Sequence, residues 1–545
     1  MNTNKRFVTA CGISRVLLLC ASAFAFALPF VAKSFDVPQI VSCVIGILGW
    51  CGISPLFVKL FISEKTLKGV LYSLFCFFFA FYFFVYSWFI SLYPLDFAGL
   101  GKWESIGVIL IPITLIPLIH SAIMTFGMFL GYLAAKKTNN NILSAVIISF
   151  GYVVGEYLQS VGTFAFPWTR LFVGQTAFPA LLQSASLFGS YFITFIMVLV
   201  NALVAFSFIN AKVNKKRGIV FLCLALLVFA TNLGFGLVRI SLFDNSGLKQ
   251  IDALVLQGNI PSGVKWSGEV DEKEIYLDLA EYAKDQILAE EYEADIAVMP
   301  ETAFPVTLYP YDGFDTDAEK TLMKISDILD AELFTGAFNT DEGNEYNSIF
   351  VYDKDGISAK PYNKNNIVPF GEFLPYRSIV EKLAPVLAEI NMLSRDLARG
   401  GDFIPLETKA GKAACLVCFD SIFPETARKQ VNNGAEFIVV TTNDSWYKTS
   451  SAVYQHADHS VMRAIENNRP VIRSANTGVS MIITSGGFVS GKIDVNKRDV
   501  LYGSVFIPEG KTLYTRVGDV IVAVGAFVIA FFLVYGFIKN KKAFR

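Results

Sequence analysis

Residues 413–420 read Ala-Ala-Cys-Leu-Val-Cys-Phe-Asp. The first five side chains are small or apolar, which favours a buried β-strand, and the run ends near Cys418, a candidate nucleophile. The strand-like run 296–299 is likewise followed closely by a reactive side chain, Glu301. α/β folds commonly present functional groups just past the ends of buried strands. We therefore predict an α/β domain built around these two runs.

A pattern typical of such a domain extends over residues 245–512, where short β-rich runs alternate with helical runs. Alternation over this length favours a layered domain with an interior sheet. The expected strands are 253–257, 296–299, 333–337, 348–352, 413–418, 437–441, 471–474, 480–484 and 503–507. The expected helices lie near 271–290, 316–330, 374–389 and 456–468.

The rest of the chain is strongly apolar. Hydrophobic residues make up 53% of the whole chain and charged residues 17%, against about 25% charged residues in an average soluble domain. A helix that crosses a membrane needs about 20 mostly apolar residues. Eight runs meet this requirement: 16–33, 38–61, 69–94, 107–135, 142–162, 181–209, 218–238 and 518–538. We therefore predict a polytopic α-helical membrane domain with seven transmembrane helices (1–244), the α/β domain (245–512), and an eighth transmembrane helix with a tail (513–545).

The distribution of positive charge predicts the orientation. If the N-terminus is cytoplasmic, the short segments on that side hold sixteen Lys and Arg residues, whereas the opposite short loops hold Lys33, Lys102 and Arg170. Positive residues favour the cytoplasmic side of a membrane. Both termini are thus expected inside and the α/β domain outside the cytoplasm. The net charge of -1 and the lack of a basic stripe predict no nucleic-acid partner.

Two of the eight cysteines, Cys415 and Cys418, lie in the polar domain. They are three residues apart in a strand-like run, where neighbouring side chains alternate between faces. We therefore expect them to point in opposite directions, with Cys415 packed in the core and no disulfide. A C-x-x-C redox or zinc pair is the alternative, but no second Cys/His pair stands at ligand spacing. We expect neither a metal nor a cofactor.

Glu301, Lys364 and Cys418 each lie at or just past a β-rich run. A thiol attacks only as a thiolate, and a nearby carboxylate can take its proton. A nearby ammonium can stabilise the thiolate and the oxyanion formed when it attacks a carbonyl. Any one of these residues alone is more often structural or solvated, so the prediction of acyl transfer depends on the set.

A series of longer motifs carries a family resemblance. In chain order they are Gln257-Gly-Asn-Ile-Pro261 with Lys265-Trp266, Pro300-Glu301-Thr-Ala, Tyr362-Asn-Lys364-Asn-Asn-Ile-Val-Pro-Phe-Gly-Glu372-Phe-Leu-Pro, Cys418-Phe-Asp, Asn443-Asp-Ser-Trp446, and Arg473-Ser-Ala-Asn476-Thr-Gly478. Together they resemble the nitrilase (carbon–nitrogen hydrolase) superfamily and, more narrowly, its membrane branch, the bacterial apolipoprotein N-acyltransferases. The apolar half agrees, with Ala165-Phe-Pro-Trp168 before a long span.

The resemblance implies a nitrilase-like α-β-β-α sandwich on the periplasmic side of a bacterial inner membrane. It implies that Cys418 takes an acyl chain from a membrane phospholipid as a thioester. The chain then passes to the N-terminal amine of a diacylglyceryl-cysteine apolipoprotein. Glu301 would be the general base and Lys364 the oxyanion partner. Glu372 would orient Lys364 or Glu301, or be a buried structural partner.

Four further residues are candidates for supporting roles. Trp266 and Trp446 would either line a lipid entrance or anchor the domain at the membrane interface. Phe419 and Asp420 stand where the family usually has Tyr-Glu, so a phenol hydroxyl and one methylene are missing. We expect the chemistry to survive this departure, because a ring and a carboxylate remain. Asn366 stands where the family often has His.

Three competing functions use the same features. A membrane-tethered amidase or nitrilase would resolve the acyl-enzyme with water, but a soluble substrate does not require eight spans. A non-catalytic lipid-binding scaffold would leave all three reactive residues without a use. A transporter would need paired intramembrane charges or broken repeat halves, which the sequence does not indicate.

Overall fold

The computed structural model describes residues 2–35, 37–95, 101–265, 267–287, 289, 292–308, 316–383 and 396–543. The chain divides into two compact units. The first, here called the membrane unit, consists of Met1–Ile90, Ile109–Ser241 and Asp519–Arg545. The second, the α/β unit, consists of Ser91–Val108 and Leu242–Gly518.

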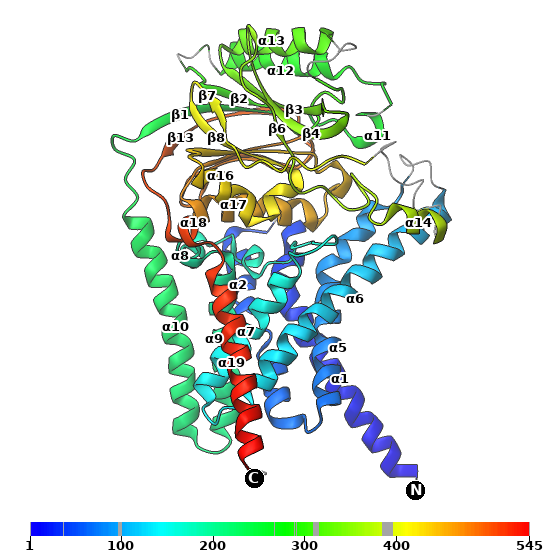
Figure 1. The fold of residues 1–545 in the computed structure, drawn as a ribbon, viewed down its shortest axis with the longest axis vertical. Coiled ribbons are helices and arrows are strands. Elements are labelled where there is room, and N and C mark those ends of the chain that lie inside the picture. The colour runs from blue at the N-terminus through cyan, green and yellow to red at the C-terminus, as the bar shows by residue number, and fades with distance from the viewer. Residues whose placement is uncertain are drawn as a thin grey trace. The chain divides into compact units, whose positions relative to one another are not determined.

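The membrane unit is helical (Figure 1). Its α-helices are α1 (Asn2–Val31), α2 (Gln39–Gly46), α3 (Leu48–Cys51), α4 (Ser54–Val58), α5 (Leu67–Val85), α6 (Lys102–Ala135, which begins in the α/β unit), α7 (Asn141–Leu158), α8 (Ala185–Phe188), α9 (Ser190–Ala211), α10 (Lys215–Ser241) and α19 (Val520–Ala543). Three turns of other helix types directly continue α1, α4 and α5: η1 (Ala32–Ser34), η2 (Lys59–Ser63) and η3 (Tyr86–Leu92). Two more, η5 (Leu171–Gln175) and η6 (Pro179–Leu182), lie between α7 and α8.

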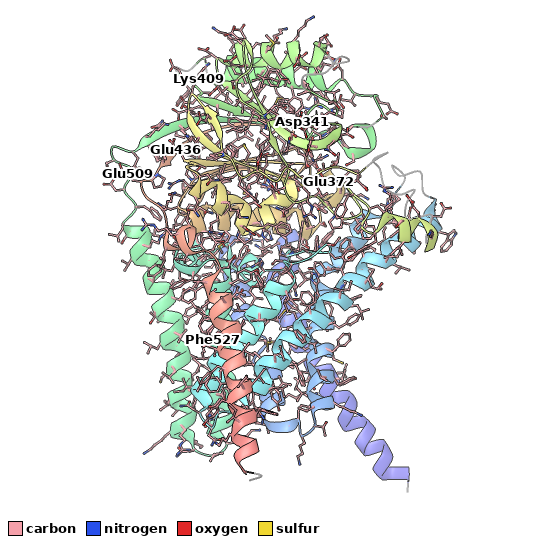
Figure 2. All side chains as sticks on the ribbon, in the orientation of Figure 1. Asp341, Glu372, Lys409, Glu436, Glu509 and Phe527 are labelled. Carbon is pink, nitrogen blue, oxygen red and sulfur yellow. The ribbon has the colours of Figure 1, made fainter. Side chains whose placement is uncertain are left out.

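Eight helices within the described residues are long and apolar enough to cross a membrane, which agrees with the eight predicted spans. They are Val16–Ser34, Gln39–Ser63, Leu67–Leu92, Lys102–Ala135, Asn141–Leu158, Ser190–Ala211, Lys215–Ser241 and Val520–Lys539. The predicted span 181–209 differs, because the chain turns at Gly189 (φ 77°) and the long helix starts only at Ser190. Several large apolar side chains point outward, such as Phe527 on α19 (Figure 2), as expected for a lipid-facing surface.

Helices α6 and α7 approach each other through glycines. A Cβ atom added at Gly127 would lie 2.7 Å from Cα of Gly155, and one added at Gly131 would lie 2.8 Å from Cα of Gly151. Small residues four apart allow helix backbones to pack closely in a membrane, where no hydrophobic force draws helices together. These four glycines therefore set the α6–α7 distance.

The α/β unit contains two sheets. The first has strand order β13-β1-β2-β3-β4-β5, with β6 paired to β4, and the second has order β12-β11-β10-β9-β8-β7. The strands are β1 (Lys249–Gln257), β2 (Ile296–Val298), β3 (Glu332–Asp341), β4 (Asn344–Asp353), β5 (Gly356–Ile357), β6 (Tyr362–Asn363), β7 (Leu406–Thr408), β8 (Gly411–Val417), β9 (Phe437–Thr442), β10 (Val471–Ala475), β11 (Ser480–Ile483), β12 (Val489–Ile493) and β13 (Asp499–Ile507). The helices and turns are α11 (Ser262–Lys265), α12 (Glu272–Gln286), α13 (Thr316–Leu329), α14 (Arg377–Leu383), η8 (Cys418–Ile422), α16 (Pro424–Asn432), η9 (Ser445–Tyr447), α17 (Ser451–Asn467) and α18 (Leu513–Val517).

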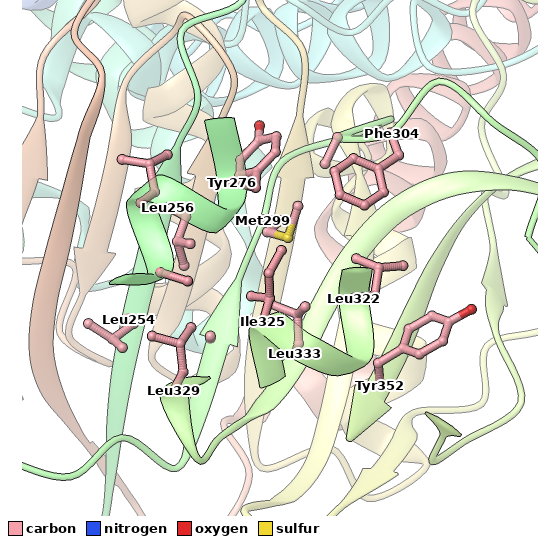
Figure 3. Packing of buried hydrophobic residues seen from close by; sticks show 14 of the residues in the cluster. Leu254, Leu256, Tyr276, Met299, Phe304, Leu322, Ile325, Leu329, Leu333 and Tyr352 are labelled. Atoms are coloured by element: carbon pink, nitrogen blue, oxygen red, sulfur yellow. The ribbon is translucent and has the colours of Figure 1, made fainter. Parts of the chain in front are cut away.

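Alternating side chains build two cores in this unit. On β1, Val255 faces the second sheet in a cluster that also contains Val439, whereas Leu254 and Leu256 face α12 and α13. Figure 3 shows the latter core, with Tyr276 and other labelled residues packed between the helices and the first sheet. Helices α16 and α17 contact the second sheet through β8 and β10. The layers are therefore α-β-β-α, which is the sandwich that the resemblance implies.

All nine predicted strands are present, with shifted ends. Strand β8 stops at Val417, one residue before Cys418. The short strands β5, β6, β7 and β12 and the helix α16 were not predicted, because two to five residues carry little periodicity and α16 is largely polar. Of the predicted helix 374–389, the structure has Arg377–Leu383, and residues 384–395 lie outside the described residues.

Candidate active site

Glu301 follows β2 by three residues and is 6% exposed. Its Oε1 accepts from Nδ2 of Asn347 at 2.7 Å and lies 3.4 Å from Nζ of Lys364. Its Oε2 accepts from the backbone N–H of Asn443 at 2.8 Å. Donors from three separate segments thus hold the carboxylate in one orientation.

The turn after Glu301 is tightly constrained. Thr302 has a φ of 45°, and a Cβ at Gly336 would lie 2.6 Å from Cα of Glu301, so only glycine allows this approach. The buried ammonium of Lys265 donates to the Glu301 carbonyl at 3.2 Å and to the Thr302 hydroxyl at 3.0 Å. Burial lowers the pKa of Lys265 to about 8, against the opposing pull of Glu301.

Lys364 follows the two-residue strand β6 and is 1% exposed. Its backbone N–H donates to the carbonyl of Asn347 at 2.9 Å, and its own carbonyl accepts from the N–H of Gly400 at 2.9 Å. Its Nζ lies 2.8 Å from Oε1 of Glu372. Burial alone would lower the pKa of Lys364, but the carboxylates of Glu372 and Glu301 raise it above its usual range. The side chain is therefore a fixed cation.

Glu372, labelled in Figure 2, lies on the loop between β6 and α14. Its Oε2 accepts from the backbone N–H of Val368 at 2.8 Å, and its Oε1 accepts from Nδ2 of Asn347 at 2.9 Å as well as from Lys364. The amide nitrogen of Asn347 therefore bridges Glu372 and Glu301. Both carboxylates converge on one ammonium.

Cys418 begins the turn η8, with a φ of 48°. The prediction that Cys418 and Cys415 point in opposite directions is wrong. Both belong to the cluster between the two sheets, because the positive φ turns the chain out of the strand pattern at Cys418. Both are free cysteines. Burial and the charge of Glu301 raise the pKa of the Cys418 thiol, and Lys364 opposes them. Glu301 and Lys364, the two partners predicted for Cys418, therefore both act electrostatically on its thiol.

The residues after Cys418 join two parts of the site. Asp420 is fully buried, and its carboxylate accepts from the backbone N–H of Asn366 at 2.7 Å, the side-chain amide of Asn366 at 2.9 Å and the hydroxyl of Tyr362 at 2.9 Å. Phe419 packs edge-on against Phe423 at 5.3 Å between ring centroids. Asp420 therefore connects the Lys364 loop to the turn at Cys418, and Asn366 is a direct partner in this connection.

Of the two tryptophans, Trp266 lies outside the described residues. Trp446 is partly buried in η9. The end of this turn is held by the segment before α6: Ser91 Oγ donates to the Tyr447 carbonyl at 3.4 Å, and Lys448 Nζ donates to the Tyr93 carbonyl at 2.6 Å. Burial and the charges of Cys418 and Asp444 raise the pKa of Tyr447, and its ring lies 6.4 Å from that of His456 between centroids. Sequence reasoning did not single out Tyr447.

Metal-binding atom types also meet at the thiol. One donor atom each from Cys418, Asp444 and His456 lies within 4.8 Å of the other two. Both nitrogens of His456 already lie at hydrogen-bond distance from protein acceptors, Oδ1 of Asp444 and the Cys418 carbonyl. The group is therefore a hydrogen-bonded network as it stands. Sequence reasoning missed it, together with Asn347, although Asp444 lies inside a quoted motif.

Two family models match the chain. Residues 254–509 match carbon-nitrogen hydrolase, and residues 22–203 match the apolipoprotein N-acyltransferase N-terminal domain. A protein from Rhodopseudomonas palustris named apolipoprotein N-acyltransferase is 30% identical over 410 residues, covering 73% of this chain and 74% of that protein. The chain belongs to the apolipoprotein N-acyltransferase family.

Other apolipoprotein N-acyltransferases are similar over most of the chain. One from Geobacter metallireducens is 29% identical and covers 80% of this chain and 84% of its own length. One from Gloeobacter violaceus is 26% identical over 90% of both chains. Among solved structures, Saccharomyces cerevisiae Nit3, described as a member of branch 10 of the nitrilase superfamily, matches 50% of this chain and 95% of its own with a TM-score of 0.36 and 15% identity. The family and the eight apolar helices identify a multi-pass bacterial membrane protein.

Proposed function

We propose that this chain transfers an acyl chain from a membrane phospholipid, through a thioester on Cys418, to the N-terminal amine of a diacylglyceryl-cysteine apolipoprotein. The observation that carries the proposal is the Lys364 ammonium, held by Glu372 and Glu301 and acting electrostatically on the Cys418 thiol. Membership of the apolipoprotein N-acyltransferase family supports the acceptor.

In the first half-reaction Glu301 takes the proton of the Cys418 thiol. A base is needed because burial raises the pKa of this thiol, so it rests in the neutral form. The sulfur attacks the ester carbonyl carbon, and Lys364 stabilises the oxyanion. Collapse breaks the ester C–O bond, and Glu301 returns the proton to the leaving alkoxide. The products are a lysophospholipid and the Cys418 thioester.

In the second half-reaction the free α-amine attacks the thioester carbonyl. Lys364 again stabilises the oxyanion, and Glu301 accepts a proton from the nitrogen. The C–S bond breaks, the amide forms, and the proton passes to the departing sulfur. A thioester survives until the amine arrives only if water is excluded. The 9% exposure of Cys418 favours such protection.

The remaining site residues have supporting roles in this proposal. Glu372 keeps Lys364 charged and in place, and Asp420 holds the Lys364 loop beside the nucleophile, with Phe419 filling the apolar side of the turn. Trp446 lines the lipid entrance or anchors the domain at the membrane interface. The reaction needs no metal and no cofactor.

We further propose that residues 245–512 form the catalytic domain, on the periplasmic side of the inner membrane. Residues 1–244 then supply seven transmembrane helices, and residues 513–545 supply the eighth. Both termini are then cytoplasmic, in line with the bias of Lys and Arg. A green fluorescent protein fused to the C-terminus should therefore fluoresce, and alkaline phosphatase fused there should be inactive. The opposite pattern would refute this orientation.

The deciding experiment is mass spectrometry of the purified protein after incubation with a phospholipid and no amine acceptor. We expect a mass increase of one acyl chain that hydroxylamine removes and that Cys418→Ser abolishes. Addition of a diacylglyceryl peptide should then discharge the enzyme with formation of an amide. Discharge by water at the same rate without the peptide would favour a hydrolase, and absence of any adduct with intact phospholipid would refute the acyltransferase proposal.

A further inference from the structure

We propose that His456 is a positioning residue that holds the carbonyl group of Cys418 and so keeps the nucleophile in its turn conformation. This inference rests on the proposed role of Cys418. His456 lies on α17 and is fully buried. Its Nε2 lies 3.1 Å from the Cys418 carbonyl oxygen and 3.1 Å from Oγ of Ser421.

The conformation of Cys418 needs support from outside its own residue. A φ of 48° is uncommon for any residue with a side chain, and such conformations persist only when the surroundings impose them. The hydroxyl of Ser421 donates to the Cys418 carbonyl at 2.7 Å from within the turn. His456 supplies a second donor, from a different element. Because a peptide unit is planar, fixing this carbonyl also fixes the direction of the Phe419 N–H.

The far side of the His456 ring is equally fixed. Its Nδ1 lies 2.7 Å from Oδ1 of Asp444, and Oδ2 of Asp444 accepts from Nη2 of Arg473 at 2.9 Å. Burial would raise the pKa of the Asp444 carboxyl, but His456 and Arg473 hold it at about 2. Asp444 is therefore an ionised carboxylate, which can only accept hydrogen bonds.

The partners of the His456 ring favour a hydrogen on Nε2. The Asp444 carboxylate faces Nδ1, and Nη2 of Arg473 lies 3.3 Å from the same nitrogen. The Cys418 carbonyl, which can only accept, faces Nε2, so this contact is a hydrogen bond when Nε2 carries the hydrogen. His456 thus joins an anchored anion, Asp444, to the backbone of the nucleophile. This double use distinguishes it from a histidine that merely fills the core.

The test compares two substitutions whose side-chain amides can each replace one of the two ring nitrogens of His456. The side-chain amide of His456→Gln can reach the Nε2 position and donate to the Cys418 carbonyl, whereas that of His456→Asn reaches only the Nδ1 position beside Asp444. We expect His456→Gln to form the thioester from phospholipid within about threefold of the wild-type rate, and His456→Asn at least about tenfold more slowly, the size expected for one hydrogen bond of about 1.4 kcal/mol. Melting temperatures of both variants report any general loss of packing.

Equal rates in the two variants would overturn the proposal, whether both match the wild type or both fall together with the melting temperature. If His456→Asn does not fold, Ser421→Ala gives a second probe, since it removes the other donor to the same carbonyl. Ser421→Ala should slow acylation several-fold. A wild-type rate in that variant would count against the proposal that the Cys418 carbonyl must be held in place.

Failure of the proposed function would look different. If the wild-type protein forms no thioester, alkylation of Cys418 by iodoacetamide still reports the placement of the thiol without any acyl donor. The order of rates should again be wild type, then His456→Gln, then His456→Asn. Cys418→Ser serves as the blank for the other cysteines.

Discussion

Lys364 pairs more closely with Glu372 than with Glu301: its Nζ lies 2.8 Å from Oε1 of Glu372 and 3.4 Å from Oε1 of Glu301. Glu372 therefore competes for the ammonium, which in the proposed reaction leaves Glu301 freer to take a proton. In Glu372→Gln the ammonium should shift toward Glu301 and form a tighter pair with it. We predict that the rate of thioester formation falls about 10- to 100-fold, as for loss of a charged hydrogen bond of about 1.5–3 kcal/mol. Single-turnover acylation measures this, and an unchanged rate would contradict it.

Lys364→Arg should fail although the charge is kept. The lysine is 1% exposed and surrounded by Glu301, Glu372 and the thiol, so a larger planar guanidinium has no room and presents its hydrogens differently. Thioester formation should fall about 10²–10³-fold, the range for loss of one oxyanion donor. Near-normal turnover in this variant would remove Lys364 from the oxyanion role.

The charges around Cys418 predict opposite effects on its reactivity. Since its thiol pKa is raised, the thiolate fraction at neutral pH is small, and iodoacetamide alkylation should rise steadily with pH through the alkaline range. Glu301→Gln removes a charge that raises this pKa and should speed alkylation at fixed pH while abolishing acyl transfer. Lys364→Met removes a charge that lowers it and should slow alkylation. The same direction of change in both variants would be inconsistent with this electrostatic picture.

Asp420→Asn should destabilise the α/β unit. Both carboxylate oxygens of Asp420 accept from donors, the amides of Asn366 and the hydroxyl of Tyr362, so an amide NH₂ in either orientation would face other hydrogens. One lost buried contact of this kind costs about 1–3 kcal/mol. The melting temperature should drop, and acylation should slow because Asp420 no longer holds the Lys364 loop to the turn at Cys418. Asp420→Glu keeps the charge but adds a methylene at a fully buried site, so it should lower the melting temperature with less effect on the rate.

Gly151→Leu should reduce the yield of folded protein. A Cβ at Gly151 would lie 3.0 Å from the Gly127 carbonyl and 3.0 Å from Cα of Gly131, so a leucine must push α7 away from α6. Gly107→Leu, on the partner helix α6 and with open space around its Cβ position, is the control. Size-exclusion chromatography in detergent should show loss of the monodisperse peak in the first variant and not in the second.

The sequence predicted the features that depend on local pattern. The eight spans follow from apolar runs, and the strands before Glu301 and Cys418 follow from short buried runs. The break at Gly189 was missed because the apolar run continues through it. The orientation of Cys418 was wrong because alternation does not extend past the end of β8.

Partners of the site residues were harder to predict, because they meet only after the sheets form. Asn347 lies in the largely polar first half of β4, one residue before the predicted strand 348–352, yet it contacts Glu301 from 46 positions away. His456 reaches Cys418 across 38 positions and from a helix whose start was placed five residues late. Strand register and helix placement decide both contacts, and the local periodicity of the sequence does not predict either of these two features.

The amide of Asn347 directs both of its hydrogens to the two carboxylates, so the separation between Glu301 and Glu372 is already fixed by β4 before any substrate arrives. In the proposed reaction the dipoles around the reacting atoms then need little reorganisation, since folding has oriented them beforehand. The charged groups are therefore arranged once, when the protein folds, and not again in each catalytic cycle.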